Sequence, residues 1–256
     1  MPASARSAAS STAPSYDVEL ALAAELGPEA VVVGVDEVGR GALAGPVTVG
    51  ACAIRICEGE VVTPLPEGVR DSKMLSAKRR GALAPQIAAD AFSTSLGWVE
   101  PEEIDRIGIS AALTEAALRA LDGLCSPEGE RLVPDAVLLD GSVDVLSAAL
   151  RARGLEEVRV AVQVKADRDC CSVAGASVVA KVARDAHMIR LHAQAPQYAW
   201  DSNKGYGAAV HRAALAEHGL HRQHRASWKL GGALSIGAPS TRASRDIRPA
   251  EQEGHR

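Results

Sequence analysis

Acidic side chains next to apolar segments are the strongest chemical signal in this sequence. Asp36 and Glu37 directly follow the mostly β-branched run 31–35, Asp140 follows a second apolar run, and Asp185 lies in a long helical segment. Several carboxylates without histidine or cysteine are the ligands that hard divalent cations prefer. The four acids therefore predict a Mg²⁺ or Mn²⁺ site of the kind that activates water for phosphoryl displacement.

Two further segments suit contact with a nucleic acid. The glycine turn 39–41 follows the acidic pair, and its backbone N–H groups can bind a phosphate or a sugar hydroxyl. A tight turn that simply requires glycine explains these residues equally well. Between residues 204 and 229, five Lys or Arg side chains stand against one Glu, with Tyr206 and Trp228 among them. That mixture suits phosphate contact and base stacking, and a solvated helix face is the alternative.

Alternating strands and helices are expected to position these groups. The predicted strands cover residues 31–35, 47–56, 92–99, 134–139 and 158–164, and the predicted helices cover 17–26, 76–86, 101–121, 144–153, 172–194 and 210–218. The short link between the first two strands implies an antiparallel hairpin, and strands separated by helices favour an α/β domain with some parallel pairing. Because side chains alternate across a strand, Asp36 and Glu37 are expected to converge only if regular pairing ends there and the backbone turns.

Composition limits the class of protein. The chain has 256 residues, of which 47% are hydrophobic, so one main domain with one sizeable core is expected. Five cysteines without a Cys-x-x-Cys pair argue against a zinc cluster or a disulfide framework and favour the reducing cytoplasm. The net charge of −4 gives no general attraction to nucleic acid, so any such affinity must be local. No segment has the length of a membrane span.

The chain is predicted to have three parts. Residues 1–30 form an N-terminal extension, partly disordered and with a short helix; residues 31–232 form the main domain; and residues 233–256 form a disordered tail rich in Ser, Pro and Arg. The acid-poor, Ser-rich start also occurs in organellar transit peptides, which is the alternative for that segment.

Seven motifs follow one another between residues 31 and 230. They are Gly34-Val-Asp-Glu-Val-Gly-Arg-Gly-Ala-Leu-Ala-Gly-Pro46, Asp71-Ser-Lys73, Leu138-Leu-Asp-Gly141, Lys165-Ala-Asp167, Ala176-Ser-Val-Val-Ala-Lys-Val-Ala-Arg-Asp185, Gly205-Tyr-Gly207 and His224-Arg-Ala-Ser-Trp228. This ordered set resembles that of type 2 ribonuclease H, the bacterial ribonuclease HII family, and it is far more specific than a lone glycine motif.

The resemblance implies a fold and an activity. The fold would be a ribonuclease H-like α/β fold, with a mixed sheet flanked by helices and a C-terminal helical part. The activity would be endonucleolytic, with two Mg²⁺ or Mn²⁺ ions activating water. It would cut RNA in RNA–DNA hybrids and the 5′ side of single ribonucleotides in duplex DNA, leaving 5′-phosphate and 3′-hydroxyl ends. A monomer without membrane contact is expected.

The resemblance also implies roles for particular residues. Catalysis and metal binding fall to Asp36, Glu37, Asp140 and Asp185. The implied substrate-binding residues are Gly39, Arg40, Gly41, Lys73, Lys165, Tyr206 and Arg225. In that set the glycine turn would contact the ribonucleotide 2′-hydroxyl and Tyr206 would read the RNA–DNA junction. The sequence departs from the family pattern at two places. Residues 168–171 replace the small polar residues of relatives, so the resemblance does not determine how the chain enters the helix that carries Asp185. Trp228 stands where Phe is expected.

Two other classes of protein share parts of this pattern. A transposase- or resolvase-like DNA nuclease could use the same acids on the same general fold, but it needs no reader of a 2′-hydroxyl such as the turn 39–41 with Tyr206. A non-catalytic nucleic-acid-binding module would not need four carboxylates, since acids near a phosphate path weaken binding when no metal is present.

Overall fold

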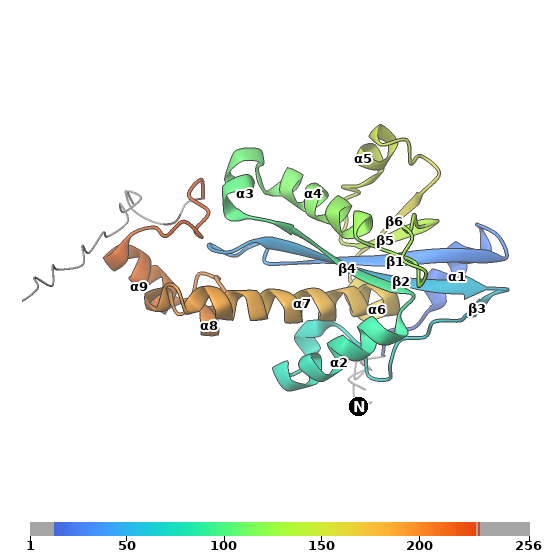
Figure 1. Ribbon diagram of the computed structural model, residues 1–256, viewed down its shortest axis with the longest axis horizontal. Coiled ribbons are helices and arrows are strands. Elements are labelled where there is room, and N and C mark those ends of the chain that lie inside the picture. Colours follow the sequence, from blue (N-terminus) through green and yellow to red (C-terminus); the bar gives the residue numbers. More distant parts are fainter. Residues whose placement is uncertain (1–12, 229, 231–256) are drawn as a thin grey trace, which may run out of the picture.

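The computed structural model describes residues 13–228 and 230. Within these residues, six strands form one mixed sheet (Figure 1). The strands are β1 (Glu29–Val38), β2 (Val47–Cys57), β3 (Glu60–Val61), β4 (Ser93–Val99), β5 (Ala136–Asp140) and β6 (Arg159–Gln163). Their order is β3-β2-β1-β5-β6, with β4 also paired to β2. The β1–β2 hairpin is antiparallel and β1–β5–β6 is parallel, which confirms the predicted mixed α/β sheet.

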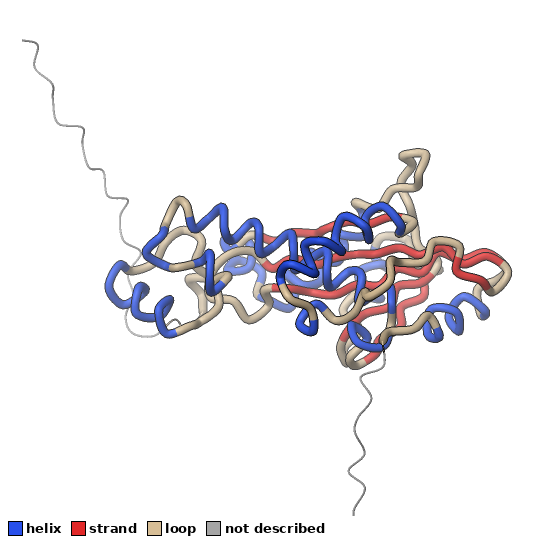
Figure 2. Tube along the Cα trace, turned by 90° about the horizontal axis from the view of Figure 1, so that it is seen from below, coloured by secondary structure: helices blue, strands red, loops and turns tan. Residues whose placement is uncertain are grey.

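Helices cover both faces of this sheet (Figures 1 and 2). On one face lie α3 (Pro101–Ile107), α4 (Ile109–Asp122) and α5 (Ser147–Ala152). On the other lie α1 (Asp17–Ala24), α2 (Ala77–Asp90), α6 (Ala166–Asp169) and the long α7 (Cys171–His192). The short α8 (Trp200–Asn203) and α9 (Ala209–His218) pack against the far end of α7. No helix among the described residues is both long enough and apolar enough to cross a membrane.

The strand β1 is buried on both faces, as its run of β-branched residues predicts. Val33 and Val35 pack in the core under α4, whereas Val32 packs in the core under α1 and α7. Between them, Gly34 lets α7 approach the strand directly, because a Cβ there would lie 2.2 Å from the carbonyl carbon of Ser172. This close crossing fixes the position of α7 relative to the residues that follow on β1.

Replacing Gly34 by Ala is therefore expected to destabilise the protein by about 1–3 kcal/mol, the usual cost of overpacking a tight core. The matched control is Gly81→Ala in α2, where a Cβ meets nothing within 4 Å, and where alanine is the better helix former by about 1 kcal/mol. Urea unfolding of both variants measures the difference. Equal stabilities for the two variants would contradict this account of the crossing.

Residues 13–30 pack against the same core as the main domain. Leu22 of α1 is buried, and the fully buried carboxylate of Glu19 accepts hydrogen bonds of 2.8 Å from both the backbone N–H and the hydroxyl of Ser172. The departure at residues 168–171 is explained here, because Cys170 and Cys171 are buried beside this segment and Ser15 bridges to Cys170. The predictions for residues 1–12 and for the tail 233–256 lie outside the described residues.

Candidate active site

The acidic pair lies where β1 loses one of its two neighbours. Pairing with β5 ends at Val35, whereas pairing with β2 continues to Val38. The expectation that regular pairing ends at Asp36 is therefore correct on the β5 side and wrong on the β2 side. Because the strand continues through both acids, their side chains leave opposite faces of the sheet.

Two cavities meet at this edge of the sheet. The first, of about 390 Å³, is on the α7 side and is lined by Lys181 and Tyr206. The second, of about 360 Å³, is on the α4 side and has more apolar walls, such as Leu113. Both cavities are lined by Asp36, Glu37, Arg40 and Asp140. The structure thus brings three of the four predicted carboxylates to one place.

A further carboxylate, Asp167, lies beside Asp140. The carboxylate of Asp140 accepts a 2.8 Å hydrogen bond from the backbone N–H of Ala166, because the parallel strands β5 and β6 end at the same edge of the sheet. Asp167 is buried and accepts a 2.9 Å hydrogen bond from the ammonium group of Lys73. The sequence interpretation missed Asp167, although it follows an apolar strand just as Asp36 and Asp140 do.

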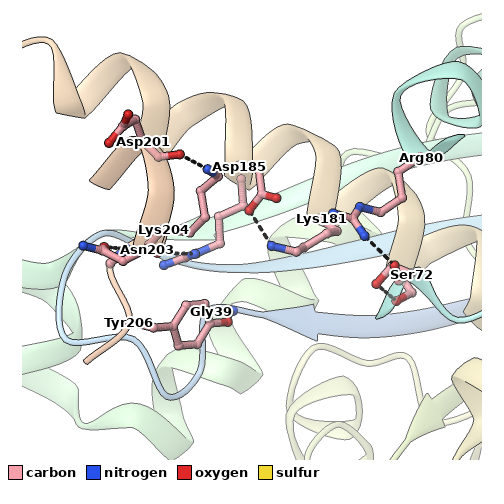
Figure 3. A network of polar contacts seen from close by, with 12 residues as sticks. Gly39, Ser72, Arg80, Lys181, Asp185, Asp201, Asn203, Lys204 and Tyr206 are labelled. Carbon is pink, nitrogen blue, oxygen red and sulfur yellow. Dashed lines mark hydrogen bonds and ion pairs between the residues drawn. The ribbon is translucent and has the colours of Figure 1, made fainter. Parts of the chain in front are cut away.

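Asp185 stands apart from these acids. It lies on α7 one turn beyond Lys181, accepts a 2.5 Å hydrogen bond from the Lys181 ammonium group (Figure 3), and lines neither cavity. Among the residues that the structure describes, no three His, Cys, Asp or Glu side chains are placed to hold a metal ion. Asp185 is thus not among the carboxylates that line the two cavities, and its role as a metal ligand stays a prediction.

The cavity carries crowded negative charge. Burial, together with the neighbouring charges of Glu37 and Asp140, raises the pKa of Asp36 to about 7. Burial is also the main cause that raises the pKa of Glu37, to which Asp140 adds, and the pKa of Asp140, to which Asp167 adds. Crowded carboxylate oxygens without thiolate or imidazole fit Mg²⁺ or Mn²⁺, because a divalent cation removes the repulsion that protonation otherwise relieves.

Two buried arginines hold the glycine turn. Arg225 is fully buried and donates hydrogen bonds of 2.6–3.2 Å to the carbonyl groups of Gly39, Arg40 and Gly45. Arg184 is also fully buried and approaches so closely that a Cβ at Gly39 would lie 2.1 Å from its Nε. The predicted contact between Arg225 and substrate is thus corrected: an enclosed guanidinium group shapes the turn from behind.

Tyr206 lies against the same turn. Its hydroxyl accepts a 3.2 Å hydrogen bond from the N–H of Gly39, its ring lies 5.5 Å from the guanidinium carbon of Arg184, and 38% of the residue is exposed. Its carbonyl accepts a 2.8 Å hydrogen bond from Nδ1 of His211, whose Nε2 lies 3.0 Å from Nε2 of His224. Burial lowers the pKa of His211 and lowers that of His224 to about 4, so the His211 ring that holds the Tyr206 carbonyl is uncharged at neutral pH.

The predicted substrate-binding residues thus fall into two groups. Those that line the cavity on the α7 side are Gly39, Arg40, Gly41, Lys73 and Tyr206. Lys165 is exposed at the start of α6, in a left-handed conformation with φ of +65°, and lines neither cavity. Arg225 is buried behind the turn.

A mixed sheet flanked by helices, with an acidic, oxygen-lined cavity beside cations and a glycine turn at one strand end, defines a nuclease of the ribonuclease H-like class. The family model described as ribonuclease HII matches residues 33–231. The chain belongs to the ribonuclease HII family and is an endoribonuclease of the ribonuclease H type.

Known relatives agree in sequence and in fold. The ribonuclease HII of Streptomyces avermitilis is 44% identical over 224 residues, which cover 86% of each chain. The crystal structure of ribonuclease H2 from Pyrococcus horikoshii has a TM-score of 0.61 at 26% identity and covers 78% of this chain and 94% of that one. The ribonuclease HII in a complex with PCNA from Archaeoglobus fulgidus also has a TM-score of 0.61, at 28% identity, covering 79% and 97%.

Proposed function

We propose that this chain cuts the RNA strand of RNA–DNA hybrids and the 5′ side of single ribonucleotides in duplex DNA, with Mg²⁺ or Mn²⁺ as cofactor. The observation that carries the proposal is the cavity on the α7 side, which Asp36, Glu37 and Asp140 line together with the glycine turn and Tyr206. As the fourth ligand the proposal takes Asp167 in place of Asp185: neither acid lines the cavities, but the charge of Asp167 acts on Asp140 and raises its pKa. The bound ions supply an activated water and charge stabilisation for the leaving oxygen.

The residues around the acids have separate tasks in this proposal. The turn 39–41 presents its backbone to the 2′-hydroxyl, and Arg225 and Arg184 keep that backbone fixed from behind. Gly41 is exposed, and a Cβ there would meet nothing within 4 Å, so a sugar can approach its backbone closely. Arg40 and Lys73 offset phosphate charge at the rim of the cavity. We propose that the protein acts as a monomer in the cytoplasm, where its five free cysteines remain reduced.

One assay separates the proposed function from its rivals. A duplex with one ribonucleotide is incubated with the protein, with and without Mg²⁺, beside an all-DNA duplex of the same sequence. We expect a single cut 5′ of the ribonucleotide that requires the metal, and no cut in the control. Cleavage of the all-DNA duplex would indicate a DNA nuclease, and binding without cleavage would indicate a binding module.

Changes at Tyr206 are expected to alter substrate choice more than metal chemistry. Tyr206→Phe removes the hydroxyl next to Gly39 and should cost about 0.5–1.5 kcal/mol of transition-state stabilisation, the net value of one hydrogen bond. Tyr206→Ala also removes the ring and should cost about 1–3 kcal/mol more. The losses should be larger for a single embedded ribonucleotide, where one 2′-hydroxyl carries all the recognition, than for a continuous hybrid.

The measurement for these variants is kcat/KM on both substrates, with circular dichroism to confirm folding. Equal losses on the two substrates would assign Tyr206 to general binding instead of ribonucleotide recognition.

A further inference from the structure

Lys181 lines the active-site cavity on the α7 side and forms an ion pair with Asp185. The two residues are one helical turn apart on α7, their N–O distance is 2.5 Å, and their side chains are only 21% and 18% exposed. Ser177, one turn before Lys181, lines the same cavity. Ser177 and Lys181 therefore face the acids of β1 across this cavity, and Asp185 follows on the next turn of α7, where Figure 3 shows its ion pair with Lys181.

Lys181 differs from the other cations around it. The guanidinium of Arg80 donates to the carbonyls of Ser72 and Leu75, and the guanidinium of Arg184 is enclosed by loop carbonyls. Both are thus committed to the protein. Lys181 lines the same cavity as the acidic pair and Tyr206. Among the described residues, its ammonium group donates a hydrogen bond to Asp185. An ammonium group has three N–H donors, so donors remain for a ligand in the cavity.

The environment explains why Lys181 needs Asp185. Burial lowers the pKa of Lys181, and the nearby charges of Arg80 and Arg184 lower it further, whereas the hydrogen bond that Lys181 donates to Asp185 raises it. A lysine side chain carries about 2 kcal/mol of rotamer entropy, and two neighbouring cations repel its ammonium group. Without Asp185, the side chain would therefore turn away toward solvent. The carboxylate holds it at the cavity wall.

We propose that Lys181 binds a backbone phosphate of the nucleic acid next to the scissile bond, and that Asp185 is a positioning residue that holds its ammonium group toward the cavity. This inference rests on the proposed function, since it assumes a nucleic acid in the cavity lined by Asp36 and Tyr206. It assigns Asp185 a role that differs from metal ligation. The carboxylate of Asp185 is paired with Lys181 at 2.5 Å, whereas the charge of Asp167 acts on Asp140 and raises its pKa. The positioning role therefore suits Asp185.

The first test is the salt dependence of binding, which counts phosphate contacts. Binding of the ribonucleotide-containing duplex is measured in Mg²⁺ across a salt series, in an Asp36→Asn background that prevents cleavage. We expect Lys181→Met to make the slope of log K against log salt less steep by about 0.9, the value for one lost phosphate contact on a duplex. Lys181→Arg should restore the slope. The control is Arg151→Met, an exposed cation on α5, on the opposite face of the sheet.

The second test separates positioning from metal ligation. Asp185→Asn is expected to leave Mg²⁺ affinity unchanged by titration calorimetry, whereas Asp140→Asn should remove it. Cleavage by otherwise wild-type Lys181→Met should fall about tenfold or more, the value of a hydrogen bond to a charged group. Melting temperatures confirm that the variants are folded.

The outcomes are distinct. A wild-type slope for Lys181→Met, or loss of Mg²⁺ binding in Asp185→Asn, would overturn the inference while leaving the proposed function intact. Failure of the wild-type protein to cut the ribonucleotide-containing duplex would instead overturn the proposed function.

Discussion

Asp36→Asn is expected to abolish cleavage while leaving the fold intact. The carboxylate lies at the common border of both cavities and contributes nothing to the apolar core. Loss of one metal ligand should remove several kcal/mol of transition-state stabilisation, which is on the order of a 10³-fold loss in rate or more. The measurement is single-turnover cleavage at saturating Mg²⁺. The control is Asp90→Asn, an exposed acid at the end of α2, which should cut at the wild-type rate.

The same variant is expected to change how stability depends on pH when no metal is present. Burial raises the pKa of Asp36 from its ordinary value of 3.8 to about 7 in the folded protein, so between these values the native state binds more protons than the unfolded state. Stability should then fall as pH rises from about 4 to about 7, by up to about 4 kcal/mol for a shift of about three units. The Asp36→Asn variant has no carboxyl group at this position, so its stability should not fall in this way over the same pH range.

Urea unfolding in EDTA at pH 4 and pH 8 measures this difference. Asp36→Asn should be more stable than the wild-type protein at pH 8, and the two should converge toward pH 4. Normal turnover by the variant would remove Asp36 from the metal site. An equal change in stability between pH 4 and pH 8 for the variant and the wild-type protein would show that the carboxylate is not crowded.

Arg225→Met is expected to destabilise the protein by about 3 kcal/mol. It is also expected to lower the cleavage rate, because the glycine turn loses the donor that holds its shape. The substitution leaves the carbonyls of Gly39, Arg40 and Gly45 without the guanidinium group that now donates to them. Each unpaired group costs about 1–3 kcal/mol. The gain from no longer burying a charge offsets part of this cost, since burial lowers the pKa of Arg225 to about 9.

The matched control is Arg222→Met, three residues away, where the residue is exposed and its guanidinium group donates to Gln194 at 3.5 Å. Its stability should stay within about 0.5 kcal/mol of the wild-type value, as for most surface substitutions. Urea unfolding compares the two variants, and cleavage is assayed below the melting temperature of each. Similar stabilities for Arg225→Met and Arg222→Met would show that the turn holds its shape without the buried cation.

Local patterns in the sequence determined the main elements of the fold. The β-branched run of β1 and the apolar run of β5 predict buried strands, and the helix predicted over 101–121 is present as α3 and α4, which meet at Gly108 with φ of +79°. The edges differ by a few residues, since β1 extends to Val38 through its pairing with β2. The short elements β3, α6 and α8 were not predicted, because two to four residues carry no measurable period.

The sequence alone also determined the family and most of the site. Acids that directly follow apolar strands identified Asp36, Glu37 and Asp140, and the ordered motifs identified the turn 39–41 and Tyr206. These groups depend on strand ends and glycine turns, which are local properties of the chain. The structure brings all of them to one cavity.

Only the tertiary structure distinguishes the surroundings of Asp167 from those of Asp185. Both acids belong to motifs, but the end of β6 places Asp167 beside Asp140, while the crossing of α7 over Gly34 sets which residues of that helix face the cavity. The same holds for Arg225, whose charge predicts a surface contact with phosphate. Its burial depends on three carbonyl groups in a turn about 180 residues earlier in the chain. A local sequence pattern does not indicate which backbone carbonyl groups of a folded loop require a side-chain donor.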